Sequence, residues 1–155
     1  MAVKTTVLLV DDNEDLLVSI KDGLESYDSA YVVDCVKDAS ECLKYVEQKN
    51  PDLVLLNIML PDMDGFTLRA KLKMTDAKDV PVIYLTAKYD IDMTRKIGML
   101  TADDFIVKPI NMHELILRIQ KVLMWRCYRN GKTPRPHMGG KRRNRQRSHN
   151  QHTTA

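Results

Sequence analysis

The sequence predicts an α/β fold with a doubly wound parallel sheet of five strands and five helices. Two observations lead to this prediction. Five short apolar segments alternate along the chain with five segments whose apolar residues recur at helical spacing. Strands that are apolar throughout belong in a parallel sheet covered by helices on both faces. Right-handed crossovers between such strands give the doubly wound arrangement.

The first half of the predicted domain contains three strands and two helices. In chain order, strand and helix alternating, these elements are expected at Val7–Val10, Glu14–Leu24, Tyr31–Val36, Ala39–Val46 and Leu53–Leu56. The second helix ends before Asn50-Pro51, because a proline disfavours helical geometry in the residue before it. The third strand is followed by a turn-rich segment, 60–65, which contains a proline and a glycine.

The second half is expected to contain three helices and two strands. In chain order, helix and strand alternating, these are Phe66–Leu72, Val82–Leu85, Ile91–Leu100, Phe105–Val107 and a helix from Asn111 to about residues 125–129. Asn111 is a suitable N-cap, and Glu114 follows it at the spacing of a capping box. The apolar residues of this last helix recur every three or four positions, as they do on the buried face of a helix.

The composition is that of one ordinary globular domain with a C-terminal extension. Of the 155 residues, 44% are hydrophobic and 29% are charged. The longest apolar runs have the length of strands and the N-terminus has no signal-peptide core, so we expect a cytoplasmic protein without membrane insertion. The three cysteines show no metal-binding or redox spacing, and we expect Cys35 and Cys42 to be buried.

The charge is divided unevenly along the chain. Residues 131–155 hold seven of the 24 Lys and Arg residues and no acid, which leaves 17 basic and 21 acidic residues in 1–130. We therefore expect a mildly acidic domain at 1–130 and a basic, flexible tail at 131–155. A disordered extension is favoured over attachment to nucleic acid, to a membrane surface or to an acidic partner, because no aromatic residues lie between the charges.

Polar side chains follow the predicted strands at the points where the strands end. They are Asp11, Asp12, Asn57, Thr86 and Lys108. The carboxyl ends of parallel strands meet at one edge of the sheet, where ligands bind in such folds. Carboxylate and carbonyl oxygens suit Mg²⁺, whereas an ammonium and a hydroxyl can hold phosphoryl oxygens. The set therefore indicates a pocket for phosphoryl-transfer chemistry.

Four motifs in this order and spacing resemble the receiver domain of response regulators. They are Val10-Asp11-Asp12, the segment from Leu55 to Gly65, Leu85-Thr86-Ala87 and Val107-Lys108-Pro109. The resemblance covers roughly residues 4–126. It implies a flavodoxin-like sheet with strand order 2-1-3-4-5 and a cis peptide bond between Lys108 and Pro109. It also implies a module that signals through protein contacts and is not an enzyme.

The resemblance implies a role for each residue of the pocket. Asp11, Asp12, Asn57 and the backbone carbonyl of Met59 would be ligands of Mg²⁺, which is the cofactor of the family. Thr86 would bind the phosphoryl group and report its presence, and Lys108 would pair with that group. Phe105 occupies the position of the switch aromatic residue of the family. The partners implied are a sensor histidine kinase and a downstream effector, which would bind the face formed by helix 4, strand 5 and helix 5. The resemblance also allows a homodimer that forms through this face.

Asn57 is the departure from the family pattern that matters most. Receivers have an aspartate at this position, and its carboxylate attacks the phosphorus of a phosphohistidine donor. An amide is uncharged and is not a nucleophile at neutral pH. It also reduces the formal charge of the pocket from −3 to −2. Our hypothesis is that this chain is not phosphorylated at residue 57. Asn57 is either an engineered inactivation or natural to a receiver that signals by binding alone.

Two alternative functions rest on other parts of the sequence. Asp62-Met63-Asp64-Gly65 resembles the motif of haloacid-dehalogenase-type phosphatases, but Pro61 and a loop separate Asp62 from the preceding strand, and turn formation is the favoured role of both aspartates. A nucleic-acid-binding function would depend on the basic tail alone. A flavodoxin-like electron carrier is set aside, because Asp11 and Asp12 would repel the phosphate of the flavin.

Overall fold

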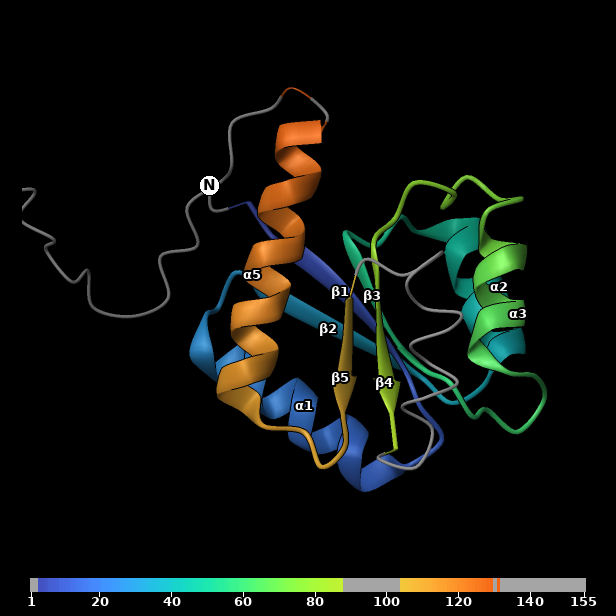
Figure 1. The fold of residues 1–155 in the computed structure, drawn as a ribbon, viewed down its shortest axis with the longest axis horizontal. Coiled ribbons are helices and arrows are strands. Elements are labelled where there is room, and N and C mark those ends of the chain that lie inside the picture. The colour runs from blue at the N-terminus through green and yellow to red at the C-terminus, as the bar shows by residue number, and fades with distance from the viewer. Residues whose placement is uncertain (1–2, 88–103, 130, 132–155) are drawn as a thin grey trace, which may run out of the picture.

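The computed structural model describes residues 3–87, 104–129 and 131 (Figure 1). The helix expected at Ile91–Leu100 lies outside the described residues, as does the predicted tail apart from Gly131. None of the helices in the described ranges is long and apolar enough to cross a membrane.

The described residues form one parallel sheet of five strands in the predicted order β2-β1-β3-β4-β5. The strands are β1 (Thr5–Val10), β2 (Tyr31–Val36), β3 (Leu53–Asn57), β4 (Val82–Thr86) and β5 (Asp104–Val107). The helices described are α1 (Glu14–Tyr27), α2 (Ala39–Gln48), α3 (Gly65–Leu72) and α5 (Met112–Arg129). The predicted α/β fold class and strand order are thus confirmed, as are four of the five predicted helices.

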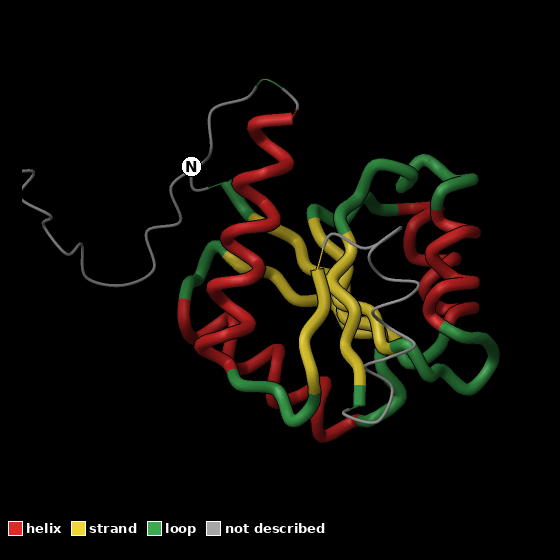
Figure 2. Tube along the Cα trace, in the orientation of Figure 1, coloured by secondary structure: helices red, strands yellow, loops and turns green. Residues whose placement is uncertain are grey.

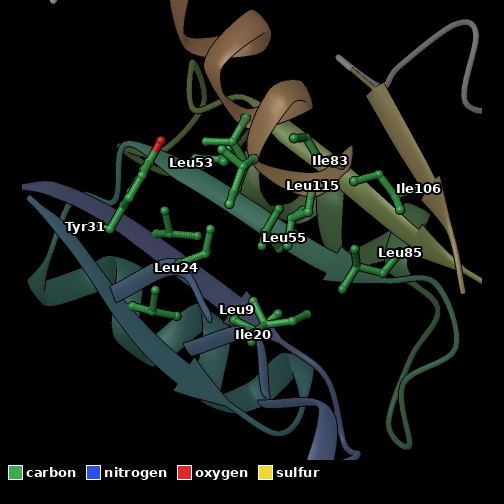
Figure 3. Close-up of a cluster of buried hydrophobic side chains, with 14 of the residues drawn as sticks. Leu9, Ile20, Leu24, Tyr31, Leu53, Leu55, Ile83, Leu85, Ile106 and Leu115 are labelled. Atoms are coloured by element: carbon green, nitrogen blue, oxygen red, sulfur yellow. The ribbon is translucent and has the colours of Figure 1, made fainter. Parts of the chain in front are cut away.

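The helices cover the sheet on both faces, with α1 and α5 on one side and α2 and α3 on the other (Figures 1 and 2). Successive residues of a strand point to opposite faces, so Leu9 packs toward α1 and α5 while Leu8 packs toward α2 and α3. Figure 3 shows the first of these two cores, in which Ile20 and Leu24 of α1 and Leu115 of α5 lie with strand residues such as Leu55.

Each of the four described helices starts at a polar cap. The side chains of Asn13, Asp38, Asp64 and Asn111 accept hydrogen bonds from backbone N–H groups three residues later, at 2.8–3.1 Å. The predicted cap at Asn111 is confirmed. Glu114 pairs with Arg118 one turn later, at 3.1 Å. These caps satisfy N–H groups that have no partner within the helix.

The prediction for the cysteines is half right. Cys42 of α2 is fully buried, and burial raises the pKa of its thiol to about 12. Cys35 is exposed, because it lies on β2, an edge strand of the sheet. An apolar run in the sequence does not distinguish an edge strand from a central one, and this is why the expectation for Cys35 was wrong.

Candidate functional site

The strand register brings four strand ends to one edge of the sheet. Asn57 is the last residue of β3 and pairs with Leu85 of β4, while Thr86 is the last residue of β4 and pairs with Val107 of β5. Asp11 follows β1 directly, and Lys108 follows β5 directly. The backbone N–H of Lys108 donates to the carbonyl of Thr86 at 2.7 Å, which fixes the end of β5 beside that of β4.

Asp11 and Lys108 form a partly buried ion pair. Asp11 is fully buried, and its Oδ2 lies 2.8 Å from Nζ of Lys108, whose side chain is 27% exposed. The other carboxylate oxygen of Asp11 accepts from the backbone N–H of Asn13 at 2.9 Å. A buried carboxylate requires such partners, because removal from water otherwise strongly disfavours its charged form.

Asn57 lies between this ion pair and Asp12, and both sides of its amide are engaged. Its Oδ1 is 3.4 Å from Nζ of Lys108 and 3.4 Å from the backbone nitrogen of Met59. Its Nδ2 donates to the carbonyl of Met59 at 2.8 Å and faces Oδ1 of Asp12 at 3.4 Å. The side chain is only 6% exposed. The structure therefore brings Asp11, Asp12, Asn57, Lys108 and the Met59 carbonyl into one cluster.

The hydrogen-bond partners determine which way this amide faces. In the opposite orientation its NH₂ group would face the ammonium of Lys108 and the N–H of Met59, which are both donors without a free acceptor. Its oxygen would then face the oxygens of Asp12 and Met59. The observed orientation places an acceptor against donors on one side and a donor against acceptors on the other.

Thr86 and Phe105 lie on the neighbouring strands β4 and β5. Thr86 is buried, and its hydroxyl donates to the carbonyl of Ala87 at 3.2 Å. Phe105, in the neighbouring strand, is partly buried against the core under α2 and α3 and pairs with Tyr84 of β4. The two residues belong to adjacent, hydrogen-bonded strands of the β4–β5 ladder.

The loop between β3 and α3 is held by contacts that the sequence analysis did not identify. Asp62 accepts hydrogen bonds from the backbone N–H groups of Ala39 and Ser40 at the start of α2, each at 3.0 Å. The bond from Ala39 is the main reason why the pKa of Asp62 lies below its ordinary value. No local sequence pattern predicts this contact, because 23 residues separate Asp62 from Ala39. Asp62 thus anchors the loop that carries the Met59 carbonyl.

Two further contacts shape this loop. Asp64 is the N-cap of α3, and a hydrogen bond from the Thr67 hydroxyl is the main cause of the lowered pKa of Asp64. Gly65 donates to the carbonyl of Ile58 at 2.6 Å. A Cβ at Gly65 would lie 2.8 Å from the backbone oxygen of Asn57. Only glycine permits so close an approach of α3 to the end of β3.

The cluster does not fit a divalent cation as it stands. Among the described residues, no group of three or more His, Cys, Asp and Glu side chains is arranged to hold a metal ion. Asp12 and the Met59 carbonyl are suitable oxygen ligands, but the group directed at them is the nitrogen of Asn57. Asp11 is already paired with Lys108. Hard cations such as Mg²⁺ take oxygen ligands, so this nitrogen is in the wrong place for one.

The strand order, with acidic and basic side chains gathered at one edge, is that of a two-component signalling domain, and the comparisons agree. The response regulator receiver domain family matches residues 7–120. The transcriptional regulatory protein PrrA of Mycobacterium tuberculosis is 36% identical over 118 residues, which cover 76% of this chain and 49% of PrrA. The chain belongs to the response regulator receiver domain family.

Other relatives support the same assignment. The transcriptional activator protein IrlR of Burkholderia pseudomallei is 33% identical over 117 residues, covering 76% of this chain and 49% of IrlR. The solved structure of the chemotaxis response regulator CheY4 of Vibrio cholerae has a TM-score of 0.70 at 25% identity, covering 77% of this chain and 99% of CheY4. A two-component response regulator from Clostridium difficile has a TM-score of 0.69 at 25% identity, covering 77% and 96%. The chain spans about half the length of the two curated relatives.

Proposed function

We propose that this chain is a cytoplasmic receiver module that signals through protein contacts without phosphorylation at residue 57. The observation that carries the proposal is the amide of Asn57 at the centre of the pocket, with Lys108 on one side and Asp12 on the other. An aspartate in this place would direct a carboxylate oxygen at an incoming phosphorus. The amide nitrogen is delocalised into its carbonyl, and the Asn57 oxygen is neutral, so neither atom is a competent nucleophile.

The other residues of the pocket keep the composition of a complete site. In our proposal Lys108 and the Thr86 hydroxyl are the groups that would hold phosphoryl oxygens, because they flank residue 57 from β5 and β4. Asp11, Asp12 and the Met59 carbonyl are where Mg²⁺, the ion used by the family, would bind if residue 57 also presented an oxygen to it. An aspartate at position 57 would thus restore both the nucleophile and the metal ligand.

We propose that partners bind the face made by β5, α5 and the helix expected at Ile91–Leu100. Receiver domains of the family exchange contacts with sensor kinases and effector domains, and the PrrA and IrlR relatives are transcriptional regulators. On this face Arg118 of α5 binds both carboxylate oxygens of Asp104 on β5, at 2.8 and 3.0 Å. Leu117, the neighbouring residue, is 53% exposed. A rigid charged network beside an exposed leucine suits a surface for a histidine kinase, an effector protein or a second copy of the chain.

Phe105 and Thr86 would link the pocket to this face. Thr86 ends β4 and Phe105 lies on β5, the strand that belongs to the proposed partner surface. A bound phosphoryl group is the signal that these positions relay in the family. With Asn57 in the pocket, we propose that the position of these two residues is constant. The chain would then present one form of the face, and its output would depend on its abundance and on its partners.

Labelling with acetyl phosphate tests the proposal. The chain and its Asn57→Asp variant are incubated with acetyl phosphate and Mg²⁺, and the acid-labile phosphate is measured by mass spectrometry. We expect phosphate on residue 57 of the variant and none on Asn57. Phosphate attached to residue 57 of the unaltered chain would overturn the proposal. The assay uses the full chain, so the tail is present in both samples.

The phosphatase alternative is disfavoured by the position of Asp62. Its carboxylate accepts two backbone N–H groups of α2, and it lies in the loop and not at the end of a strand. We expect no turnover of p-nitrophenyl phosphate with Mg²⁺. The nucleic-acid-binding hypothesis depends only on the tail. It is tested by comparing the nucleic-acid affinity of the full chain with that of a chain shortened to residues 1–130.

A further inference from the structure

We infer that the side-chain amide of Asn57 takes the place of the divalent ion in this receiver, so that the pocket keeps its geometry without a metal ion. This goes beyond the proposed function, because a chain that accepts no phosphate could still bind Mg²⁺. The nitrogen of the Asn57 amide faces Asp12 and the Met59 carbonyl, and its oxygen faces Lys108.

Two oxygen atoms that would bind a cation are bridged by one nitrogen. Oδ1 of Asp12 and the carbonyl oxygen of Met59 both face Nδ2 of Asn57, at 3.4 and 2.8 Å. Both oxygens are acceptors, and a positively polarised group between them can contact the two at once. A cation supplies such a group in a metal site. An amide NH₂ also supplies it, because it has two hydrogens and can direct one at each oxygen.

The opposite side of the amide holds it in this orientation. Its oxygen faces Nζ of Lys108 and the backbone nitrogen of Met59, both at 3.4 Å. For Asn57 to offer that oxygen to Mg²⁺, the amide would have to turn over and set its NH₂ group against these two donors. Binding of a metal ion would therefore break the hydrogen bond from Asn57 to the Met59 carbonyl. It would also leave the NH₂ group of Asn57 facing two other donors.

The charge of the pocket also disfavours the ion. Asp11 and Asp12 contribute two negative charges and Lys108 one positive charge, so Asn57 leaves a net charge of −1 where an aspartate would give −2. The carboxylate of Asp11 is already paired with the ammonium group of Lys108, at 2.8 Å. One carboxylate and one carbonyl then remain for Mg²⁺, an ion that gives up its water reluctantly.

The consequence is a pocket whose geometry does not depend on metal. The Met59 carbonyl belongs to the β3–α3 loop, which is joined to β3 through Asn57 and to α2 through Asp62. This loop should keep one conformation in the presence and absence of Mg²⁺. In a receiver with an aspartate at position 57, three carboxylates near one another repel until a cation binds.

Titration with metal tests the inference without any phosphorylation. Mg²⁺ is added to the full chain and to its Asn57→Asp variant in calorimetry, and Mn²⁺ is added to both while paramagnetic broadening of the amide resonance of Met59 is followed. We expect the variant to bind Mg²⁺ at least about tenfold more tightly than the unaltered chain, because it adds a charge and an oxygen ligand. Equal affinity of the two proteins, or no binding by the variant, would overturn the inference.

A third variant separates the bridging amide from the missing charge. Asn57→Leu has a similar volume and no donor. Thermal unfolding is compared in EDTA and in Mg²⁺, with the ionic strength matched by NaCl. We expect the midpoint of Asn57→Leu to lie below that of the unaltered chain in both solutions, and that of Asn57→Asp to rise only with Mg²⁺. A midpoint of Asn57→Leu equal to that of the unaltered chain would contradict a bridging role. If Asn57→Leu does not fold, the Mn²⁺ comparison of the other two proteins decides.

Discussion

The ammonium nitrogen of Lys108 lies 2.8 Å from Oδ2 of Asp11 and joins the ends of β5 and β1, which are not neighbours in the sheet. β3 and β4 stand between these two strands, so the ion pair crosses the carboxyl edge of the sheet over Asn57. It is therefore a structural clamp as well as part of the pocket.

Removal of Lys108 should destabilise the protein. In Lys108→Ala the carboxylate of Asp11 stays buried without its cation, and we expect a loss of about 3 kcal/mol in the free energy of unfolding. The expected loss is at the low end of the range for buried ion pairs, because the side chain of Lys108 is 27% exposed. Urea denaturation measures the change. Lys44→Ala, an exposed lysine of α2, is the control and should change stability little.

A second substitution identifies the cause. Asp11→Asn in the Lys108→Ala background removes the stranded charge but keeps an oxygen for the N–H of Asn13. We expect the double variant to be more stable than Lys108→Ala alone, which is the sign of a coupled pair. If the two losses simply add, the ion pair does not explain the effect.

The anchor formed by Asp62 should make stability depend on pH. The hydrogen bond from Ala39 holds the pKa of Asp62 below its ordinary value of 3.8 in the folded state. A group with a lowered folded pKa stabilises the protein above its unfolded pKa, and this stabilisation disappears as the pH falls through the folded pKa. The stability difference between the unaltered chain and Asp62→Asn should thus be present at neutral pH and vanish in acid.

Urea midpoints at neutral pH and at several values below pH 4 check this prediction. Asp76→Asn changes an exposed acid in the segment after α3 and serves as the control for the change in net charge. A difference between Asp62→Asn and the unaltered chain that stays constant over the whole pH range would speak against the anchor.

The two glycines in the described helices, Gly23 and Gly65, should respond differently to alanine. At Gly65 a Cβ would lie 2.8 Å from the backbone oxygen of Asn57 and 3.0 Å from Cα of Ile58, so the chain itself must move. We expect Gly65→Ala to lower the free energy of unfolding by about 1–3 kcal/mol, as overpacking does. At Gly23 the nearest atom is Cε of Met112, the end of a flexible side chain.

Gly23→Ala is therefore the matched control. It exchanges glycine for alanine within α1, which favours the helix by about 1 kcal/mol, and Met112 can turn aside. We expect its urea midpoint to be equal to or above that of the unaltered chain. If Gly65→Ala is equally harmless, α3 does not approach β3 as closely as the structure has it.

The five strands and the four described helices could be predicted from local patterns, as could the gathering of Asp11, Asn57 and Lys108 at strand ends. Apolar runs such as Leu53–Leu56 mark strands, and the residue after each run falls at the carboxyl edge of the sheet. The contacts that hold the pocket together are not local. The anchor from Asp62 to Ala39 spans 23 residues, and Gly65 needs its close approach only because α3 turns back toward β3.

The orientation of the Asn57 amide was likewise beyond sequence reasoning. The residue type allows either its oxygen or its nitrogen to face Asp12. Only the simultaneous presence of Lys108 and the Met59 N–H on the other side selects the nitrogen. The family resemblance implies Asn57 as a ligand of Mg²⁺, whereas the arrangement of these neighbours directs its nitrogen at the other two oxygen ligands.

A contact near the C-terminal end of α5 leads to a prediction about the end of the domain. Nη1 of Arg126 donates to the backbone carbonyl of Asp52 at 2.8 Å, at the entrance to β3. The side chain of Asp52 accepts the N–H of Thr6 at 2.8 Å, so α5, β3 and β1 are joined at this point. Hydrogen bonds to a charged group contribute about 1.5–3 kcal/mol, and Arg126→Ala should lose an amount in this range.

Two shortened chains locate the boundary. A chain of residues 1–130 keeps Arg126 and should unfold at the same urea concentration as the full chain. A chain that ends at Val122 loses this contact together with the last turns of α5, and should be less stable than Arg126→Ala. Lys121→Ala, an exposed lysine of the same helix, controls for loss of a positive charge. A marked loss of stability in the 1–130 chain would show that residues beyond 130 contribute to the domain, and would place its boundary further along the sequence.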